Sequence, residues 1–355
     1  MNESRLHTGR RRFLQALAML AVAGRSLLRS RDARAGENAA SGSAGNAASG
    51  SAGADIDWPA MSYRRLGRTN FEASRLVFGC GAALSSSPND PLLEAALDAG
   101  VNVFDVGTRR YYDDAERHMA GFLRKHREEL FLISKAPIYL DVEPDQAITA
   151  AQGRQGASTW LECLDESLGQ LGVEQVDAYY LMASNNPTIV GSDEIQRAFQ
   201  KAKQAGKVKH LGLSTHQNAQ AVLAKAIEIG SYDLAMIAIT PGGWYDWENR
   251  KVLEGSPPMV ELQPLLARAR ESGMGLIGMK AGRYLAGRKF LGWGKPDAFD
   301  RYYDPEFRTS KLSAFQRSYA YVLAHGLDCV NADSQTLEHL RENATAAATS
   351  TRYFA

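Results

Sequence analysis

An aspartate, a lysine and two tyrosines lie along one stretch of the sequence, in types and spacing that could do proton chemistry. The stretch from Val101 to Lys135 reads V-N-V-F-D up to Asp105, then a polar loop with Tyr111 and Tyr112, a helical pattern, and L-F-L-I-S-K. A free phenol has a pKa of about 10, too high for efficient proton donation at neutral pH. An ammonium nearby lowers the pKa of a phenol, and a carboxylate can hold that ammonium in place. If these side chains converge, they would form a proton-donating tyrosine.

A βαβ unit must position these residues. Two short apolar runs of strand character end in Asp105 and Lys135, and a helical pattern lies between them. In parallel α/β folds, side chains at the carboxyl ends of the strands face the ligand crevice. The pattern therefore predicts that both side chains point toward a ligand site. The alternative is an ordinary buried ion pair between neighbouring strands.

The same alternation of strand and helix continues to the end of the chain. From Tyr63 a short hairpin is predicted, with Gly67 and Asn70 as turn residues. Eight strands alternating with helices predict a closed α/β fold, a (β/α)8 TIM barrel with a short N-terminal β-hairpin. An open doubly wound sheet is the alternative, but no G-x-G-x-x-G follows the first strand. The predicted strands are 74–79, 101–105, 130–135, 178–182, 208–213, 234–239, 275–279 and 328–331, and the predicted helices include 91–99, 158–171, 194–205, 218–229, 260–272, 311–324 and 334–347.

The N-terminal segment has the pattern of an export signal. Arg10-Arg11-Arg12-Phe13-Leu14 resembles the twin-arginine motif, and the apolar run that follows is shorter than the about 20 residues that a membrane span needs. We therefore predict a twin-arginine signal peptide at 1–35, a flexible Gly/Ala/Ser/Asn linker at 36–60 with two N-A-A-S-G-S-A-G repeats, and the barrel at 61–355. The predicted partner is the twin-arginine export machinery, the location is the bacterial periplasm, and no stable membrane span remains after cleavage. A basic disordered tail is the alternative.

Composition narrows the class of function. The 355 residues are 45% hydrophobic and carry a formal net charge of +1, which gives no argument for a nucleic-acid partner. Cys80, Cys163 and Cys329 are far apart and have no metal-binding spacing. The seven histidines form no H-x-H or H-x-x-x-H pair within the barrel, which counts against a metal-dependent hydrolase and predicts no metal site.

From residue 62 to residue 347 the sequence resembles the aldo-keto reductases. Six segments carry the resemblance in order: Y-R-R-L-G-R-T-N-F-E-A-S-R-L, A-L-D-A-G-V-N-V-F-D, V-D-A-Y-Y-L, G-K-V-K-H-L-G-L-S, G-M-G-L-I-G-M-K and L-E-H-L-R-E-N. The resemblance implies carbonyl reduction with a hydride from NADPH. It also implies a tyrosine that protonates the substrate oxygen, a lysine paired with an aspartate, and a histidine that orients the substrate. Asp105 and Lys135 match the aspartate and the lysine.

Two positions depart from the family's pattern. The tyrosine usually lies five residues after the aspartate, where this chain has Arg110. Tyr112 fits if the loop carries a small insertion, and Tyr111 is the alternative donor. The expected histidine is Met182, whose thioether cannot donate a proton or a hydrogen bond. On the substrate side, Met182 would therefore be joined by Asn185 or His216.

The resemblance also implies a set of cofactor contacts. Because the family uses NADPH, NADP(H) is the cofactor that the resemblance implies. Asp333 would repel the 2′-phosphate of NADP(H), although Arg341 could compensate, so NAD(H) is the alternative. The implied cofactor-binding residues are Ser214, Thr215, Lys280, Gly282, Arg283, Ser334, Gln335, Glu342 and Asn343.

We thus expect an exported NAD(P)(H)-dependent oxidoreductase of aldo-keto reductase type. Its substrate would be a small-molecule carbonyl (aldehyde, ketone or sugar-like compound), reduced to an alcohol by hydride transfer. Because Met182 replaces the histidine, the alternative is a catalytically impaired or specialised barrel that binds a ligand or a partner.

Overall fold

The computed structural model describes residues 56–286 and 294–353. From Trp58 onward the chain forms one compact unit. The predicted signal peptide at 1–35 and most of the predicted linker lie outside the described residues. Within the described part, no helix has the length and apolar character needed to cross a membrane.

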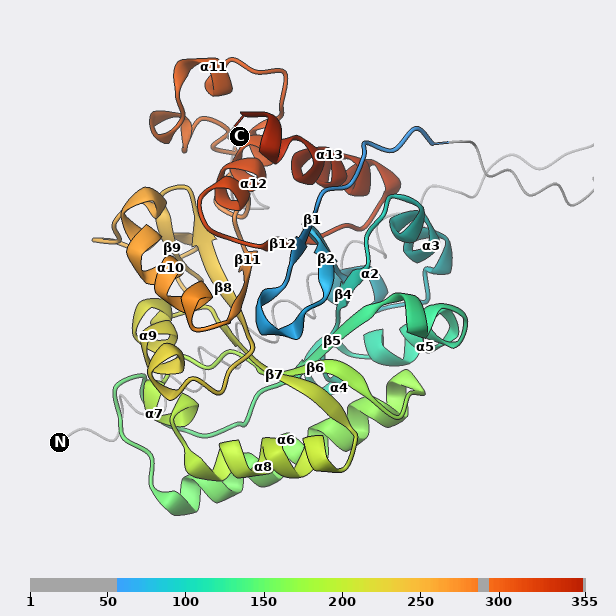
Figure 1. Ribbon diagram of the computed structural model, residues 1–355, viewed down its shortest axis with the longest axis vertical. Coiled ribbons are helices and arrows are strands. Elements are labelled where there is room, and N and C mark those ends of the chain that lie inside the picture. The colour runs from blue at the N-terminus through green and yellow to red at the C-terminus, as the bar shows by residue number, and fades with distance from the viewer. Residues whose placement is uncertain (1–55, 287–293, 354–355) are drawn as a thin grey trace, which may run out of the picture. The chain divides into compact units, whose positions relative to one another are not determined.

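Eight parallel strands form a closed barrel, which confirms the predicted fold class (Figure 1). Seven neighbouring pairs join them in the order β8, β11, β12, β3, β4, β5, β6 and β7, and an eighth parallel pairing between β7 and β8 closes the ring. All eight predicted strands are present. Their bounds are β3 Leu76–Gly79, β4 Val103–Asp105, β5 Phe131–Ala136, β6 Val176–Leu181, β7 Val208–Thr215, β8 Leu234–Thr240, β11 Gly275–Met279 and β12 Cys329–Asp333.

The predicted hairpin is also present and closes the amino end of the barrel. Strands β1 (Tyr63–Arg65) and β2 (Glu72–Ser74) pair antiparallel across a 3-10 turn, η1 (Gly67–Thr69). Gly67 and Asn70 take left-handed φ angles of 53° and 58°, as turn residues do. Leu66 is fully buried in the barrel interior, and a Cβ added to Gly275, the first residue of β11, would lie 2.8 Å from it. The hairpin therefore leaves the carboxyl ends of the strands as the open end.

Helices surround the strands (Figure 1). The longer ones are α3 Asp90–Asp98, α5 Ala115–His126, α6 Ala150–Leu171, α8 Asp193–Gln204, α9 Ala219–Ile229, α10 Gln263–Glu271, α12 Ala314–Ala324 and α13 Leu337–Tyr353. The shorter ones are α2 Cys80–Leu84, α4 Arg109–Tyr112, α7 Pro187–Val190, α11 Pro305–Arg308 and the 3-10 helices η2 Arg127–Glu129, η3 Met259–Leu262 and η4 Asp300–Tyr302.

Helix α6 and an antiparallel strand pair are among the elements that differ from the sequence prediction. Helix α6 begins at Ala150 rather than at 158, because Thr149 and Gln152 form a reciprocal capping box. An antiparallel pair, β9 (Gly243–Asp246) and β10 (Lys251–Val252), extends the sheet beyond β8 and was not predicted.

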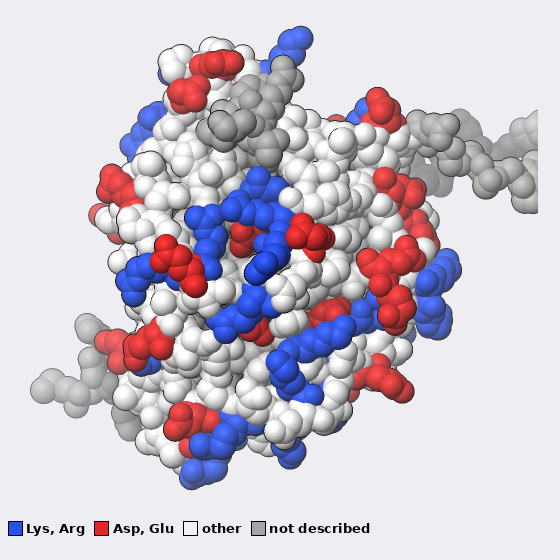
Figure 2. Space-filling view, viewed as in Figure 1, with Lys and Arg blue, Asp and Glu red and all other residues white. Residues whose placement is uncertain are grey.

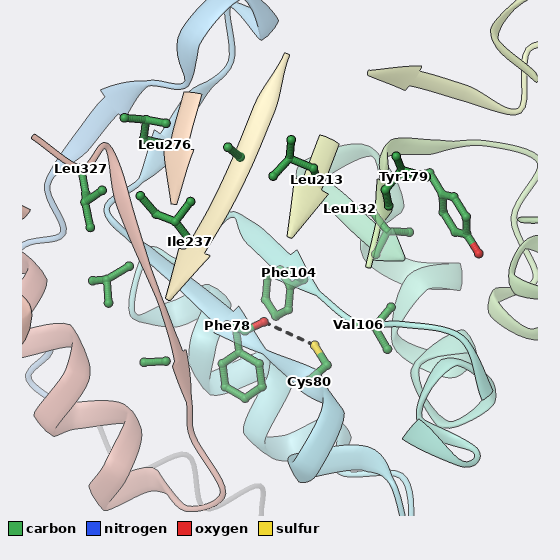
Figure 3. Close-up of a cluster of buried hydrophobic side chains, with 14 of the residues drawn as sticks. Phe78, Cys80, Phe104, Val106, Leu132, Tyr179, Leu213, Ile237, Leu276 and Leu327 are labelled. Carbon is green, nitrogen blue, oxygen red and sulfur yellow. Dashed lines mark hydrogen bonds between the residues drawn. The ribbon is translucent and has the colours of Figure 1, made fainter. Parts of the chain in front are cut away.

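The buried apolar side chains form two layers. One lies between the strands and the helices and includes Phe78, Phe104, Leu132 and Tyr179 (Figure 3). The other fills the barrel interior and consists of alternate residues of the strands, such as Val103 on β4, Ile133 on β5 and Cys329 on β12. Two residues further along these strands come Asp105, Lys135 and Asn331, which therefore face the interior at its open end.

Candidate active site at the carboxyl ends of the strands

Asp105 and Lys135 meet at the carboxyl ends of two neighbouring strands, β4 and β5. The Lys135 Nζ donates hydrogen bonds to Asp105 Oδ1 and Oδ2, each at 2.6 Å, and to the Val106 carbonyl at 2.6 Å. The two side chains are 5% and 4% exposed. Charge-assisted bonds of this length in a buried setting hold an ammonium firmly. The structure thus brings together the two residues on which the expected chemistry depends.

Asn331, a residue that the sequence reasoning missed, supports this pair from β12. Its Nδ2 donates a hydrogen bond to Asp105 Oδ2 at 2.7 Å. Strand β3 lies between β12 and β4, and its inward-facing residue at this level is Gly79. A Cβ at Gly79 would lie 2.7 Å from Asn331 Oδ1, so the missing side chain leaves room for the amide to cross. The period-2 pattern of β12, with Cys329 inside, could have identified Asn331 as inward-facing.

The short helix α4 brings Tyr112 beside the ion pair. The Lys135 Nζ lies 5.3 Å from the Tyr112 ring centroid. The ring packs against Gly81 and Gly107, and a Cβ at Gly107 would lie 2.9 Å from it. Tyr111 packs edge-on against Tyr112, with 4.6 Å between the ring centroids. Both candidate donors therefore lie at the site, with the Tyr112 ring packed directly over it.

The electrostatic environment keeps both phenols protonated. Burial raises the pKa of Tyr112 well above its ordinary value, and the carboxylates of Asp105 and Asp333 raise it further. Burial also raises the pKa of Tyr111, as does Tyr112, whereas the Lys135 ammonium acts in the lowering direction. The expected lowering by the ammonium is therefore seen on Tyr111 and is outweighed by burial.

Arg110, at the usual tyrosine position of the resemblance, points away from the pair. Its Nε forms an ion pair with Glu166 Oε2 on α6 at 3.0 Å. The side chain is exposed. Arg110 therefore takes no part in the Asp105–Lys135 pair, and the small insertion in this loop stays a prediction.

Met182 and Asn185 follow β6 at the open end of the barrel. Met182 is 4% exposed, and its N–H donates to the Ala136 carbonyl at 2.9 Å. The Asn185 Oδ1 accepts from Thr215 Oγ1 at 3.1 Å and from the N–H groups of His216 and Gln217 at 3.3 and 3.1 Å. Asn185 therefore fixes the loop after β7 with its carbonyl oxygen, which leaves its amide nitrogen for a ligand.

His216 lies on that loop and faces an aromatic ring and two cations. Its ring centroid is 5.3 Å from that of Trp247. Burial, with the charges of Lys280 and Lys135, lowers its pKa to about 3. The imidazole is therefore neutral at physiological pH and can donate one hydrogen bond but supplies no proton.

The two residues at the end of β7 that are expected to contact the nicotinamide differ in the hydrogen bonds of their hydroxyl groups. The Ser214 Oγ accepts from the Ala183 N–H at 3.2 Å, so its own O–H is available to a ligand. The Thr215 Oγ1 is fully buried and bonds the Gln217 carbonyl at 2.6 Å and the Asn185 side chain. Thr215 therefore holds the loop, and Ser214 is the residue that can donate to an amide.

The loop after β11 carries Lys280, Gly282 and Arg283. Gly282 packs tightly against α12, since a Cβ there would lie 2.7 Å from Phe315. Arg283 is half-buried and has no ion-pair partner in the part of the chain that the structure describes. The Lys280 Nζ lies 4.6 Å from the Trp247 ring centroid. This loop thus presents two cations at the open end.

The expected adenosine contacts form bonds among themselves and with α12. The Asn343 Nδ2 donates to Ser334 Oγ at 2.9 Å, and both residues are buried. Ser313 donates a hydrogen bond to Glu342 from the start of α12. Gln335 is exposed and donates to Asp333 Oδ2 at 3.3 Å. These bonds fix the start of α13 and leave Gln335 on the surface.

Metal-ligating side chains do not gather at this site. In residues 56–286 and 294–353, no three His, Cys, Asp or Glu side chains are placed to hold a metal ion. Cys80, Cys163 and Cys329 are buried free thiols, and burial raises the pKa of each.

Parts of the chain are similar in sequence to known proteins. Residues 77–240 match the model of the aldo/keto reductase family. The chain is 31% identical over 161 residues to "Probable aldo-keto reductase 1" of Glycine max, covering 42% of this chain and 44% of that protein. It is 25% identical over 246 residues to L-glyceraldehyde 3-phosphate reductase of Escherichia coli K12, covering 64% and 65%. The matches thus span less than two thirds of either relative.

Solved structures show the same fold. The aldo-keto reductase of Bacillus halodurans in its holo form aligns with a TM-score of 0.55 at 20% identity, covering 81% of this chain and 90% of that one. At that identity the likeness shows the barrel architecture. The sequence similarity to aldo/keto reductases therefore extends over residues 77–240, and the solved structures share the barrel fold.

Proposed function

We propose that this protein is an NAD(P)(H)-dependent reductase that converts a small carbonyl compound to an alcohol. The observation that carries the proposal is the buried Asp105–Lys135 pair with the Tyr112 ring packed over it. In this arrangement, a phenol at the open end of the barrel donates a proton to the substrate oxygen. Lys135 stabilises the negative charge that the phenol acquires, and Asp105 holds Lys135 in place.

The residues at the open end fit a nicotinamide dinucleotide. Among the residues that the structure describes, the Ser214 O–H and the Arg283 guanidinium have no acceptor or ion-pair partner; the first suits a carboxamide oxygen and the second a pyrophosphate. When bound, the nicotinamide supplies the hydride. The protein's part is to orient the carbonyl, to donate the proton from Tyr112, or from Tyr111 as the alternative, and to exclude water from the ion pair.

Asp333 bears on the choice between the two dinucleotides. It is exposed at the end of β12, beside Gln335 on the expected adenosine side. A carboxylate there repels a 2′-phosphate and accepts hydrogen bonds from a ribose 2′-hydroxyl. NAD(H) is therefore the alternative to NADP(H), and Asp333→Ser is expected to shift the preference toward NADPH.

A titration of the purified protein with NADPH and with NADH, followed by nicotinamide fluorescence, tests the proposal. We expect saturable binding of at least one cofactor, and oxidation of that cofactor with aldehydes, ketones or sugar-like carbonyls. The panel includes L-glyceraldehyde 3-phosphate because a relative is named for reducing it. Lys135→Met should bind cofactor yet lose turnover. A protein that binds neither cofactor is not a reductase of this type.

A second function is a barrel that binds a ligand without turning it over. The observation that favours it is the buried thioether of Met182 where an orienting imidazole is expected. Met182→His separates the two: a large gain in turnover from a near-inactive native protein supports the binding role. High native turnover rules that role out.

We further propose that the protein is exported to the periplasm by the twin-arginine machinery, on the strength of Arg10-Arg11 and the apolar run after them. Replacing Arg10 and Arg11 together by Lys should leave the protein in the cytoplasmic fraction of a bacterial host. Arg12→Lys is the matched control and should be exported. Export of the double variant would contradict this route.

A further inference from the structure

We propose that the open end of the barrel holds a subsite for an anionic group of the substrate, formed by Lys280 against Trp247 and His216. The ligand class is a carbonyl compound that also carries a carboxylate or a phosphate. This inference rests on the proposed function in that the anion is part of the molecule being reduced. It concerns a contact with the substrate, whereas the resemblance placed Lys280 among the cofactor contacts.

The position of the Lys280 ammonium is set by an uncommon backbone conformation. Lys280 directly follows β11 and has a φ angle of 67°, the left-handed region that long side chains seldom occupy. Its Nζ lies 4.6 Å from the Trp247 ring centroid. Backbone strain of this kind gathers at functional sites, where it directs a side chain.

Lys280 is a half-buried cation without a direct anionic partner among the residues that the structure describes. No described residue forms an ion pair or a hydrogen bond with its ammonium; Asp333 and Asp105 act on it only at longer range, as do the cations Arg283 and Lys135. Burial lowers the pKa of Lys280 to about 8. An ammonium taken from water without a partner is costly, and an incoming anion would recover that cost.

Hydrogen bonds hold the backbone that carries Trp247, the ring against which Lys280 lies. The backbone N–H of Trp247 donates to Gln217 Oε1 at 3.3 Å, and Gln217 Nε2 donates to Asp246 Oδ1 at 3.0 Å. Asn249 Nδ2 holds the other Asp246 oxygen at 2.6 Å. The turn that carries Trp247 is thus held in place, and its indole contacts both His216 and Lys280, which favours a preorganised binding surface.

The subsite lies next to the Asp105–Lys135 pair. The ammonium groups of Lys280 and Lys135 both lower the pKa of His216, so the imidazole lies within reach of both charges. Met182 offers no hydrogen bond to a carbonyl oxygen. An ion pair between Lys280 and an anionic group at the other end of the substrate would orient the carbonyl instead. The neutral His216 could donate a hydrogen bond to the same anion.

Two matched aldehydes test the proposal in the intact protein with saturating cofactor: 4-carboxybenzaldehyde, an anion, and 4-methylbenzaldehyde, its neutral counterpart. Lys280→Met keeps the length of the side chain and removes its charge. We expect the KM for the carboxylate to rise roughly 10- to 100-fold, as for loss of one charge-assisted bond, with the KM for the neutral aldehyde within about twofold. Lys280→Arg should recover most of the loss.

The pH dependence gives a second readout. Only the protonated Lys280 binds an anion, so the native KM for 4-carboxybenzaldehyde should rise above pH about 8, and the bound anion should shift that rise to higher pH. The neutral aldehyde should show no such rise. An equal KM change for both aldehydes, or a weaker affinity for NADPH alone, would assign Lys280 to the fold or to the cofactor and overturn the proposal.

Calorimetry with 4-carboxybenzyl alcohol separates this inference from the proposed function. If no aldehyde is reduced but the native protein binds the alcohol and Lys280→Met does not, the reductase function fails and the anion subsite stands. If native protein and variant bind it equally, or neither binds it, the subsite is wrong, whatever the turnover.

Discussion

At the scale of single residues, the site depends on Gly79, which has no side chain to block the hydrogen bond between Asn331 and Asp105. Gly79 faces the barrel interior between β12 and β4, and its lack of a Cβ lets Asn331 reach Asp105 at 2.7 Å. The carboxylate is thereby held by Lys135 on one side and by an amide on the other. A carboxylate fixed from two directions also fixes the ammonium, which is what a proton-donating tyrosine beside it requires.

We predict that Asn331→Leu lowers kcat roughly tenfold, because a hydrogen bond to a charged group contributes about 1.5–3 kcal/mol. Gly79→Ala should act in the same direction by displacing the amide. The measurement is kcat as a function of pH. In both variants Asp105 loses the hydrogen bond from Asn331, so the pH profile should shift and kcat should fall. Cys329→Ala, one layer deeper on the same strand, is the control. Unchanged profiles in both variants would make Asn331 a packing residue only.

The choice between the two phenols is a second prediction at this scale. Tyr112→Phe should reduce kcat by roughly 100-fold or more, the usual contribution of a general acid. Tyr111→Phe should have a small effect, since its ring supports Tyr112 edge-on. Cofactor affinity measured by fluorescence should be the same in both. The opposite ranking of kcat would identify Tyr111 as the donor, in line with the action of Lys135 on its pKa.

At the scale of elements, local capping decides where α6 begins. The segment before 158 is rich in Gly and Gln and looks like a connection in the sequence. Yet Thr149 Oγ1 accepts from the Gln152 N–H at 3.2 Å, and the Gln152 side chain bonds back to the Thr149 N–H at 2.9 Å. Gly156 then packs against Ile138, where a Cβ would lie 3.1 Å from its side chain. The cap and this close approach outweigh the low helix propensity of glycine.

Removal of this cap should destabilise the protein measurably. Thr149→Ala is expected to lower the free energy of unfolding by about 1 kcal/mol, because it leaves the Gln152 N–H without its acceptor. Chemical denaturation followed by far-UV circular dichroism measures the change. Thr149→Ser, which keeps the hydroxyl, should unfold like the native protein. Equal stability of the Ala variant would show that tertiary packing alone starts the helix.

At the scale of the whole molecule, the closed barrel imposes a dependence of stability on pH. His216 is half-buried, and burial, with the charges of Lys280 and Lys135, lowers its pKa from 6.5 to about 3. The unfolded chain therefore binds this proton first, and acid favours unfolding. The free energy of unfolding should fall as pH drops below about 6.5 and should continue to fall toward pH 3.

Urea denaturation at pH 7 and at pH 4.5 tests this dependence. His216→Gln should lose less stability between the two pH values than the native protein. His339→Gln removes an exposed histidine and should follow the native protein. If all three proteins lose stability equally, His216 is not the group responsible.

The sequence by itself determined the barrel and its central pair. Eight apolar runs alternating with helical patterns require a parallel sheet covered on both faces. Asp105 and Lys135 end two consecutive strands, so sequence position alone places them at one edge. The strands, the helices and the positions of these two residues at strand ends are local features, which the periodicity of apolar residues predicts well.

Tertiary structure decided the rest, because it depends on contacts between segments far apart in the chain. Asn331 reaches Asp105 from 226 positions away, through the gap at Gly79. Arg110 turns to Glu166 on α6, and the Thr215 hydroxyl bonds Asn185 Oδ1 and the Gln217 carbonyl instead of a ligand. The Lys280–Trp247–His216 wall needs the antiparallel β9–β10 pair, whose four- and two-residue strands are too short to show a pattern. Some polar side chains form their hydrogen bonds within the fold, and others remain available to a ligand. Only the closed barrel distinguishes the two groups.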